Sequence, residues 1–403
     1  MSNFEIILDK ALRDNIVDHY PHPIAYRFLL AVNAGENQEK LQGLLDLYAA
    51  VVRYCAVIAI SDYLRSDLLN PAVNIGILEL MDRSSVTQWE GLCREIAQTF
   101  VRISQSMFVD ELKRFYLLPN EQLSAYGFSL KYWLNFFTQA KRAYGIDRVP
   151  PELFCTRLSE LEELLKGLAF LTEYRLVQIL ACSISGSGMC RFTVKEWMGV
   201  DPPVESVQIV GACIEEQLRK ENPAVLALYH ADRNKLLSLY PFLICDLSKL
   251  PSPKGIEEEL FFFNGRQANS VSYYSAIHGL DGARVTGRYL SDLDSLISRC
   301  IIGGPDTSVS WQASAQVAFQ GQTRTILDDI RQTEYEASVY LHRGRVETAV
   351  KEFLADDRYI GFLLIGDSGT GKTNLLAHVA EDRIRQGDIV LLRAFGNSRD
   401  KPR

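Results

Sequence analysis

Apolar residues recur at every third or fourth position through much of the first 173 residues, which is the spacing of amphipathic helices. Four segments are expected to be helical on this ground: Gln38–Leu68, a helix through Val101 capped by Ser84 or Ser85, a helix capped by Ser129, and Leu158–Leu171. Serine before such a pattern is a good cap because its hydroxyl accepts a hydrogen bond from the first turn. Pro71 marks the end of the first and longest helix.

The pattern changes at about Tyr174, where apolar residues gather in short runs separated by turn-forming residues. Five runs are expected to be strands: Arg175–Cys182, Arg191–Val194, Leu237–Cys245, Glu259–Phe263 and Val271–Ser275. The dipeptide Asn264–Gly265 favours a hairpin turn between the last two. Pro241 has no N–H to donate, so we expect it at an edge or a bulge. The sequence thus predicts a small antiparallel sheet packed on the helices.

A break follows at Gly303–Asp306, and residues 307–322 are mostly small and polar. The expected division is a helical module at 1–173, an α+β module with an antiparallel meander at 174–302 that forms one domain with it, a linker and connector helix at 303–335, and a further domain at 336–403. The predicted fold class is α+β, mostly helical at the N-terminal end. The last segment is expected to be the start of an α/β P-loop domain.

The basis for that last expectation is a complete G-x-x-x-x-G-K-[ST] motif. Its residues are Gly366, Asp367, Ser368, Gly369, Thr370, Gly371, Lys372 and Thr373. The apolar run Tyr359–Ile365 before it predicts a buried strand, Asn374–Gln386 after it an amphipathic helix, and Asp388–Leu392 the start of a second strand. This strand–loop–helix–strand order is the context that a phosphate-binding loop requires. The alternative is a glycine-rich turn that holds no ligand.

Each part of the motif suits a polyphosphate. Glycines let the backbone wrap closely and direct successive N–H groups inward. Lys372 is expected to reach the β- and γ-phosphates, the Thr373 hydroxyl to ligate Mg²⁺, and Asn374 to complete the nucleotide-binding set. The expected ligand is ATP or GTP. The base stays open because the loop contacts phosphates only.

This segment resembles the opening of a STAND-type (NACHT/AAA-related) P-loop ATPase. The stretch Tyr340–Glu347 is similar to the aromatic-x-G-R-E lead-in of that family, although His342 stands where glycine is usual and Gly344 where glutamate is usual. In the family the lead-in lies near the adenine, so the resemblance adds Arg343 to the expected nucleotide-binding residues. The other interpretation of this stretch is an ordinary amphipathic helix packed on the sheet.

The residues before the motif resemble a module of uncharacterised function that precedes P-loop ATPases in some bacterial, notably cyanobacterial, multidomain proteins. The similarity lies in Tyr174–Val177, Leu239–Phe242 and the run ending Phe263–Asn264–Gly265. It carries no catalytic motif. The resemblance implies a signalling or defence protein in which the module senses a signal or acts as the effector, through self-association or a protein partner.

Hydrolysis requires an acidic residue at the C-terminal end of a later strand, to hold Mg²⁺ and orient water. Asp388 stands at the start of its strand instead, and the sequence after Lys372 contains no other candidate. We therefore expect a chain truncated shortly after the motif. On this expectation the chain binds nucleotide but is inactive as an ATPase by itself.

Composition limits the kinds of partner and the compartment that we expect for this chain. Charged residues make up 23% of the chain, apolar residues 47%, and the net charge of −7 gives no reason to expect nucleic acid as a partner. The eight cysteines include no C-x-x-C pair, which favours free thiols in a reducing cytoplasm. The first residues lack the pattern of a signal peptide. The longest apolar stretch, Leu44–Ile60, contains Asp46 and Arg53 and predicts a core helix, not a membrane span.

Other candidate sites in the first 302 residues have weaker patterns. Arg13 and His19 have the spacing of an arginine–histidine ribonuclease pair, but so short a pattern recurs by chance, and a solvated helix face is the favoured interpretation. Glu160 and Glu163 share one face of a predicted helix, which indicates solvation. Glu257–Glu259 precedes a predicted strand and is interpreted as protection of a sheet edge.

Two functional hypotheses therefore remain. The first is a nucleotide switch, in which ATP or GTP bound at the motif changes the position of the N-terminal module. The second is a non-catalytic interaction module of helices and sheet, with a P-loop remnant that no longer binds nucleotide.

Overall fold

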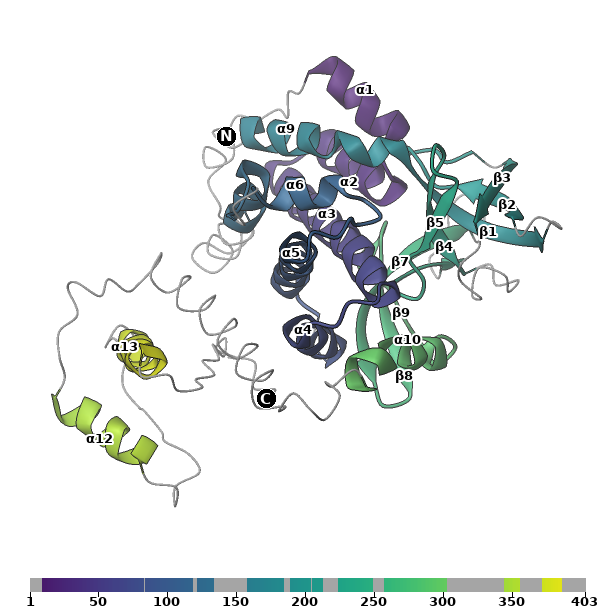
Figure 1. Ribbon diagram of the computed structural model, residues 1–403. Helices are drawn as coiled ribbons and strands as arrows, with labels where there is room; N and C mark the ends of the chain where they lie inside the picture. Colours follow the sequence, from purple (N-terminus) through teal and green to yellow (C-terminus); the bar gives the residue numbers. More distant parts are fainter. Residues whose placement is uncertain are drawn as a thin grey trace. The chain divides into compact units, whose positions relative to one another are not determined.

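A computed structural model describes residues 9–82, 84–118, 122–133, 158–184, 189–203, 205–212, 224–248, 257–302, 344–355 and 372–385. The chain divides into two compact units, Met1–Ile302 and Gly303–Arg403, whose helices and strands are drawn in Figure 1. The first unit combines helices with two small sheets in which antiparallel pairing dominates, so the predicted α+β class is confirmed for it. The predicted connector at 303–335 and both strands flanking the glycine-rich motif lie outside the described residues.

The described helices of the first unit include α1 (Lys10–His19), α2 (His22–Asn33), α3 (Asn37–Arg65), α4 (Pro71–Asp82), α5 (Val86–Arg102), α6 (Glu111–Tyr116), α9 (Leu158–Gly167), the 3-10 helix η2 (Ala169–Glu173) and α10 (Leu290–Ile302). The predicted long helix is α3, and Pro71, expected only after its end, begins α4. Ser85 caps α5 by accepting the Gln88 N–H, as predicted. The helix over residues 125–133 starts earlier than expected, because Ser124 and not Ser129 accepts the N–H of Gly127.

Helix α3 forms the centre of the core. Every residue from Ala50 to Ile60 is buried, because α2 and α5 pack against it and the second sheet lies nearby (Figure 1). Residues Gln38–Arg65 are long and apolar enough to cross a membrane by length and composition, but 78% of the most apolar stretch is already buried inside the protein. The interpretation of Leu44–Ile60 as part of a core helix is therefore confirmed.

Five strands form a closed barrel in the order β1 (Tyr174–Ile184), β2 (Met189–Glu196), β3 (Ser206–Ala212), β5 (Lys235–Ser238) and β4 (Leu226–His230). Neighbours pair antiparallel, except that β3 and β5 close the barrel through a parallel pair, Ala212 with Lys235. A bulge between Ile179 and Ala181 bends β1, which pairs with β2 along its length and with β4 at its start. The prediction of a single small sheet was wrong, because closure depends on pairings between residues far apart in the sequence.

The second sheet has four antiparallel strands in chain order: β6 (Leu243–Leu247), β7 (Glu258–Gln267), β8 (Ser270–Ser275) and β9 (Gly279–Thr286). The predicted strand Leu237–Cys245 is two strands, because a turn at Leu239–Phe242 separates β5 in the barrel from β6 in this sheet. Pro241 lies in that turn and not at an edge or bulge. Asn264 and Gly265 lie inside β7 at a bulge, and the turn to β8 comes after Gln267, so the predicted hairpin position was also wrong.

The described part of the second unit consists of α12 (Gly344–Ala355) and α13 (Lys372–Arg385). Val350 on α12 and Leu375 and Val379 on α13 form a buried apolar cluster, with Val346 packed against it. The two helices are therefore held side by side by their apolar faces.

Candidate functional site

The predicted nucleotide-binding residues divide between described and undescribed parts of the chain. Gly366–Gly371 and Arg343 lie outside the described residues. Lys372 is the first residue of α13, Thr373 the second and Asn374 the third. The structure thus gives the start of the helix that follows the glycines, and Arg343 immediately precedes α12 in the sequence.

The first turn of α13 is suited to an anion. The first four N–H groups of an α-helix have no acceptor within the helix, and the aligned peptide dipoles give this end a partial positive charge. The first turn contains no acidic residue, and its first residue is a lysine. A negatively charged group would therefore be stabilised at this end without competition from a carboxylate of the same turn.

Helix α12 supports α13 from one side. Leu375 follows the motif by two positions and is almost completely buried in the cluster with Val350 and Val379. The part of the Tyr340–Glu347 stretch that the structure describes belongs to the amphipathic helix α12, which fits both interpretations of that stretch. Among the described residues, α12 packs against α13. The nucleotide-binding role of Arg343, which precedes α12, therefore stays a prediction.

The first unit does not bring together the arginine and histidine of the candidate ribonuclease pair. Arg13 and His19 are both exposed on α1. Six residues along an α-helix turn through about 600°, so these two side chains leave the helix about 120° apart. They do not converge on a common point, and a solvated helix face accounts for both.

The acidic clusters have structural partners. Of the predicted solvated pair on α9, Glu163 is exposed and Glu160 is partly exposed. Glu163 and its neighbour Glu162 pair with Lys166 at 3.1 and 2.9 Å. The interpretation of Glu257–Glu259 as protection of a sheet edge was wrong. Strand β7 lies inside its sheet, where Glu258 binds Lys195 at 3.0 Å and the buried Glu259 accepts a hydrogen bond from the Ser275 hydroxyl.

Glu258 belongs to a polar cluster that joins the barrel to the second sheet. It accepts a hydrogen bond from Gln178 on β1, and the Gln178 side-chain oxygen accepts the indole N–H of Trp197 at 3.1 Å. The Lys195 ammonium lies 4.5 Å from the centre of the Trp197 ring. Nothing in the local sequence indicated this cluster, because its members come from β1, from β7 and from the end of β2 with the residue that follows it.

His22 packs against the same tryptophan and donates from Nδ1 to the Gly199 carbonyl at 2.8 Å. Burial lowers the pKa of His22 to about 4, although the bond to Gly199 opposes the shift. The imidazole is therefore neutral at pH 7. It ties α2 to the segment after β2 and is not placed to transfer protons with solvent.

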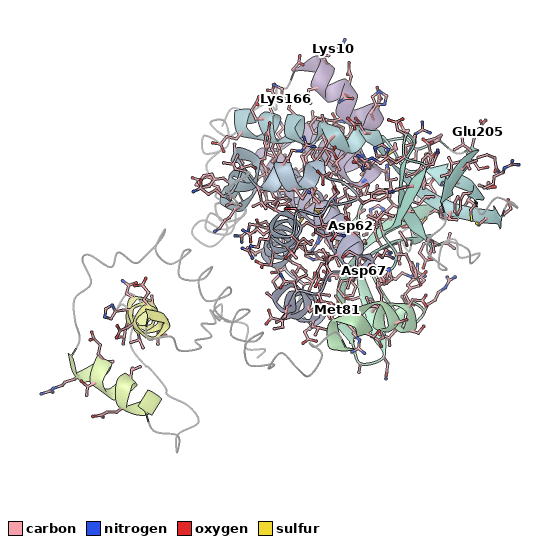
Figure 2. All side chains as sticks on the ribbon, in the orientation of Figure 1. Lys10, Asp62, Asp67, Met81, Lys166 and Glu205 are labelled. Carbon is pink, nitrogen blue, oxygen red and sulfur yellow. The ribbon has the colours of Figure 1, made fainter. Side chains whose placement is uncertain are left out.

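One carboxylate does titrate closer to neutrality. Asp62, near the end of α3 and labelled in Figure 2, accepts the Phe108 N–H at 2.6 Å. Burial raises the pKa of Asp62 to about 6, an effect that the hydrogen bond from Phe108 and the charge of Arg65 partly offset. This group holds the segment after α5 against α3.

The described cysteines and histidines form no metal-binding group and no disulfide. Among the described residues no three of His, Cys, Asp and Glu are grouped as metal ligands. The six described cysteines are free thiols, five of them buried. Burial raises the pKa of Cys55 to about 12, so this thiol is protonated and unreactive at neutral pH.

Comparison with protein-family models, with curated proteins and with solved structures finds no match to this chain. The case for a function therefore depends on the glycine-rich motif and on the helix that follows it.

Proposed function

We propose that Gly366–Thr373 binds the polyphosphate of a nucleoside triphosphate, and that ATP with Mg²⁺ is the ligand. The observation that carries this proposal is the start of α13 at Lys372, the lysine of the motif. In a phosphate-binding loop the helix must begin at this lysine, because its free N–H groups and dipole act on the same phosphates as the ammonium group. The motif by itself would also allow a helix that began several residues later.

The residue types at the start of α13 fit the ligand and its metal. Mg²⁺ prefers hard oxygen donors and is commonly held by one or two protein oxygens together with phosphate oxygens. Thr373 supplies such an oxygen directly beside the lysine that would neutralise phosphate charge. When bound, Mg²⁺ would bridge phosphate oxygens and reduce their mutual repulsion. Binding, and not hydrolysis, is the activity that these residues support.

The biological role that we propose is a nucleotide switch of the STAND type in the cytoplasm. Nucleotide can act as a switch because loops that contact the γ-phosphate become ordered when it is present. Arg343, just before α12, would then lie near the adenine. The first unit would be the sensor or effector, acting through self-association or a protein partner.

Thermal unfolding of the full-length chain with increasing Mg-ATP tests the binding proposal. A ligand that binds only the folded state stabilises it by about 2.7 kcal/mol at one hundred times its dissociation constant. We expect Mg-ATP to raise the unfolding temperature and Lys372→Ala to remove that rise. Lys10→Ala is the matched control, because Lys10 is exposed on α1 in the first unit (Figure 2). Mg-GTP in parallel determines the preferred base.

The metal is tested separately at Thr373. Thr373→Ala should weaken ATP binding in the presence of Mg²⁺ and leave binding in EDTA unchanged, whereas Thr373→Ser should retain the magnesium dependence. If the wild-type chain shows no rise with either nucleotide, or Lys372→Ala shows the same rise, the motif does not bind nucleotide. The interaction-module hypothesis would then be the better one.

A further inference from the structure

The closed barrel leaves one of its faces open to solvent. Its strand order, β1-β2-β3-β5-β4 with a parallel pair between β3 and β5, is that of the OB fold, a five-stranded Greek-key barrel. Proteins of this fold bind ligands across β2 and β3, between the β1–β2 and β4–β5 loops. In Figure 1, β2 and β3 lie on the side of the first unit that points away from α3, α4 and α5. The outer face of β2 and β3 is therefore the part of the barrel that is placed to receive a ligand.

The side chains of β2 and β3 alternate between the barrel core and this outer face. Phe192 on β2 and Ile209 on β3 pair with each other, and both are buried. Their neighbours Arg191 and Val210 also pair across the two strands, but both are exposed, Val210 by 44%. Successive side chains of a strand point to opposite faces, so Arg191 and Val210 lie side by side on the outer face. The face thus presents a cation directly beside an exposed apolar side chain.

The turn between β4 and β5 adds two further cations to the same end of this face. Lys235, the first residue of β5, pairs with the last residue of β3. The Asn234 side-chain amide lies 3.2 Å from the Val210 carbonyl oxygen, which holds the turn against β3. Arg233 and Lys235 are both exposed. Because Arg191 is paired with Val210, all three cations gather where β3 ends.

The charge at this end of the barrel is opposite in sign to the net charge of the whole chain. Among the residues described there, Asp232 is the one carboxylate beside the three cations. Residues 213–223, which connect β3 to β4, contain three glutamates and two basic residues, so the positive excess remains when they are counted. Glu205, labelled in Figure 2, is exposed just before β3 begins and therefore lies at the other end of that strand. A local excess of positive charge attracts a polyanion even to a chain that is negative overall.

We propose that the outer face of β2 and β3 binds a single strand of nucleic acid, with Arg191, Arg233 and Lys235 on its phosphates. The fold indicates the place, and the cations indicate the ligand. OB folds bind oligonucleotides or oligosaccharides on this face, and of these two the oligonucleotide is the one whose charge requires cations. The planar Arg191 guanidinium supports an unstacked base, with Val210 beside it. A duplex keeps its bases stacked inside and does not make this contact. The site is independent of the nucleotide-binding proposal.

The test is fluorescence anisotropy of a labelled oligouridine of about 12 nucleotides, within the site size of one OB fold, titrated with the full-length chain. Lys372→Ala serves as the parent chain, because the glycine-rich motif could itself bind phosphate groups. We expect a dissociation constant of about 1–100 µM at physiological salt, the range of binding through phosphates alone. Three phosphate contacts to a single strand predict that the logarithm of the association constant falls with the logarithm of salt concentration with a slope of about −2. Oligodeoxythymidine should bind with similar affinity, because both strands carry the same phosphates.

Substitutions on the outer face assign the binding to this site. Arg191→Gln, Arg233→Gln and Lys235→Gln should each weaken binding and reduce the size of the salt slope by about 0.7. Val210→Ser should weaken binding and leave the slope unchanged, because it removes no phosphate contact. The matched control is Arg114→Gln, an exposed arginine on α6, which should bind like the parent chain. All five positions are exposed, and unfolding temperatures equal to that of the parent chain confirm that the fold is intact.

The proposal fails if the parent chain does not change the anisotropy at concentrations up to about 100 µM, or if Arg191→Gln leaves both affinity and slope unchanged. A duplex of the same length that binds as tightly as the single strand also contradicts it, because the bases then take no part. If polyglutamate displaces the label as effectively as unlabelled oligouridine does, the face binds acidic polymers in general and the assignment to nucleic acid is wrong. Loss of the Mg-ATP response in Lys372→Ala with retention of oligouridine binding would separate the two sites.

Discussion

Gly43 lies on the side of α3 that faces α2, opposite Ala31. A Cβ at position 43 would lie 2.7 Å from Ala31 Cα and 3.0 Å from Ala31 Cβ, closer than side-chain carbons normally approach a backbone atom. Gly91, in the interior of α5, is the natural comparison, because a Cβ there would meet nothing within 4 Å. The two glycines occupy the same secondary structure and differ in what faces them.

The two substitutions to alanine should therefore change stability in opposite directions. Alanine is favoured over glycine inside a helix by about 1 kcal/mol. At position 91 nothing opposes this term, so Gly91→Ala should raise the free energy of unfolding by about 0.5–1 kcal/mol. At position 43 the helices must move apart, and overpacking of this kind costs about 1–3 kcal/mol. Gly43→Ala should therefore lower the free energy of unfolding by up to about 2 kcal/mol.

Urea unfolding of the full-length chain, followed by far-ultraviolet circular dichroism, measures both effects. Wild type and the two variants should have the same denaturant dependence, so that midpoints compare directly. Ala31→Gly in the Gly43→Ala background removes the contact at 3.0 Å but not the one at 2.7 Å, so the double variant should lose less stability than the sum of the losses in the two single variants. If Gly43→Ala is as stable as Gly91→Ala, α2 and α3 do not approach each other as closely as described.

Two further predictions concern buried polar groups. Because burial raises the pKa of Asp62 to about 6, the folded chain holds this proton more tightly than the unfolded chain. Its contribution to stability is then fully present below about pH 4 and is lost as pH rises through 6. Asp62→Asn should remove this pH-dependent loss, which is at most about 3 kcal/mol of the free energy of unfolding at pH 8. If the difference in free energy of unfolding between wild type and variant stays constant from pH 4 to 8, the reasoning is wrong. Gln178→Met should cost about 1–3 kcal/mol, because the buried Trp197 N–H loses its acceptor. Glu258→Gln should cost less than about 1 kcal/mol, because its ion pair with Lys195 is partly exposed, and urea midpoints of the two variants test the order.

The helices could be predicted because their signal is local. In α3 apolar residues recur at helical spacing from Leu41 to Tyr48 and then form a buried run too long for one strand, and the cap of α5 lies within four residues of sequence. Errors arose where two local signals compete. Ser124 and Ser129 are both acceptable caps, and only the tertiary position of Ser124, whose hydroxyl also donates to the Phe115 carbonyl, decides between them.

The strands show the limit of local reasoning more clearly. The strand propensity of Leu237–Cys245 is continuous, yet its two halves belong to different sheets. Barrel closure between β3 and β5 brings together residues that have no common sequence pattern. The Asn264–Gly265 dipeptide has the composition of a turn, but Gly265 is used for a bulge that bends β7, with a φ of +146°. Propensity describes what a dipeptide can do, and tertiary pairing selects among those possibilities.

The candidate nucleotide-binding site, unlike the strand pairings, could be predicted from the sequence. The glycine-rich motif was visible in the sequence because the chemistry of phosphate binding requires fixed residues at fixed spacing. The meeting of the two buried arginines, Arg27 and Arg53, was not visible in the sequence. Arg53 was noted only as a charge that interrupts an apolar stretch, and Arg27 not at all, because their common feature is a junction of α2, α3 and β8 that exists only in the fold.

These junctions have a common physical logic. The apolar faces of helices and sheets attract one another without direction, so burial alone does not determine which helix meets which strand. Directional polar contacts determine which helix packs against which strand. Arg27 binds the Ala276 carbonyl, and Tyr174 on β1 donates to Glu111 on α6 at 2.7 Å. Each contact joins elements far apart in the sequence, and each leaves a buried charge or hydroxyl unpaired if the wrong elements pack together. Because misplacing such a group costs more than the correct contact contributes, these few polar pairs select one arrangement of barrel, sheet and helices from the many that an apolar core would accept.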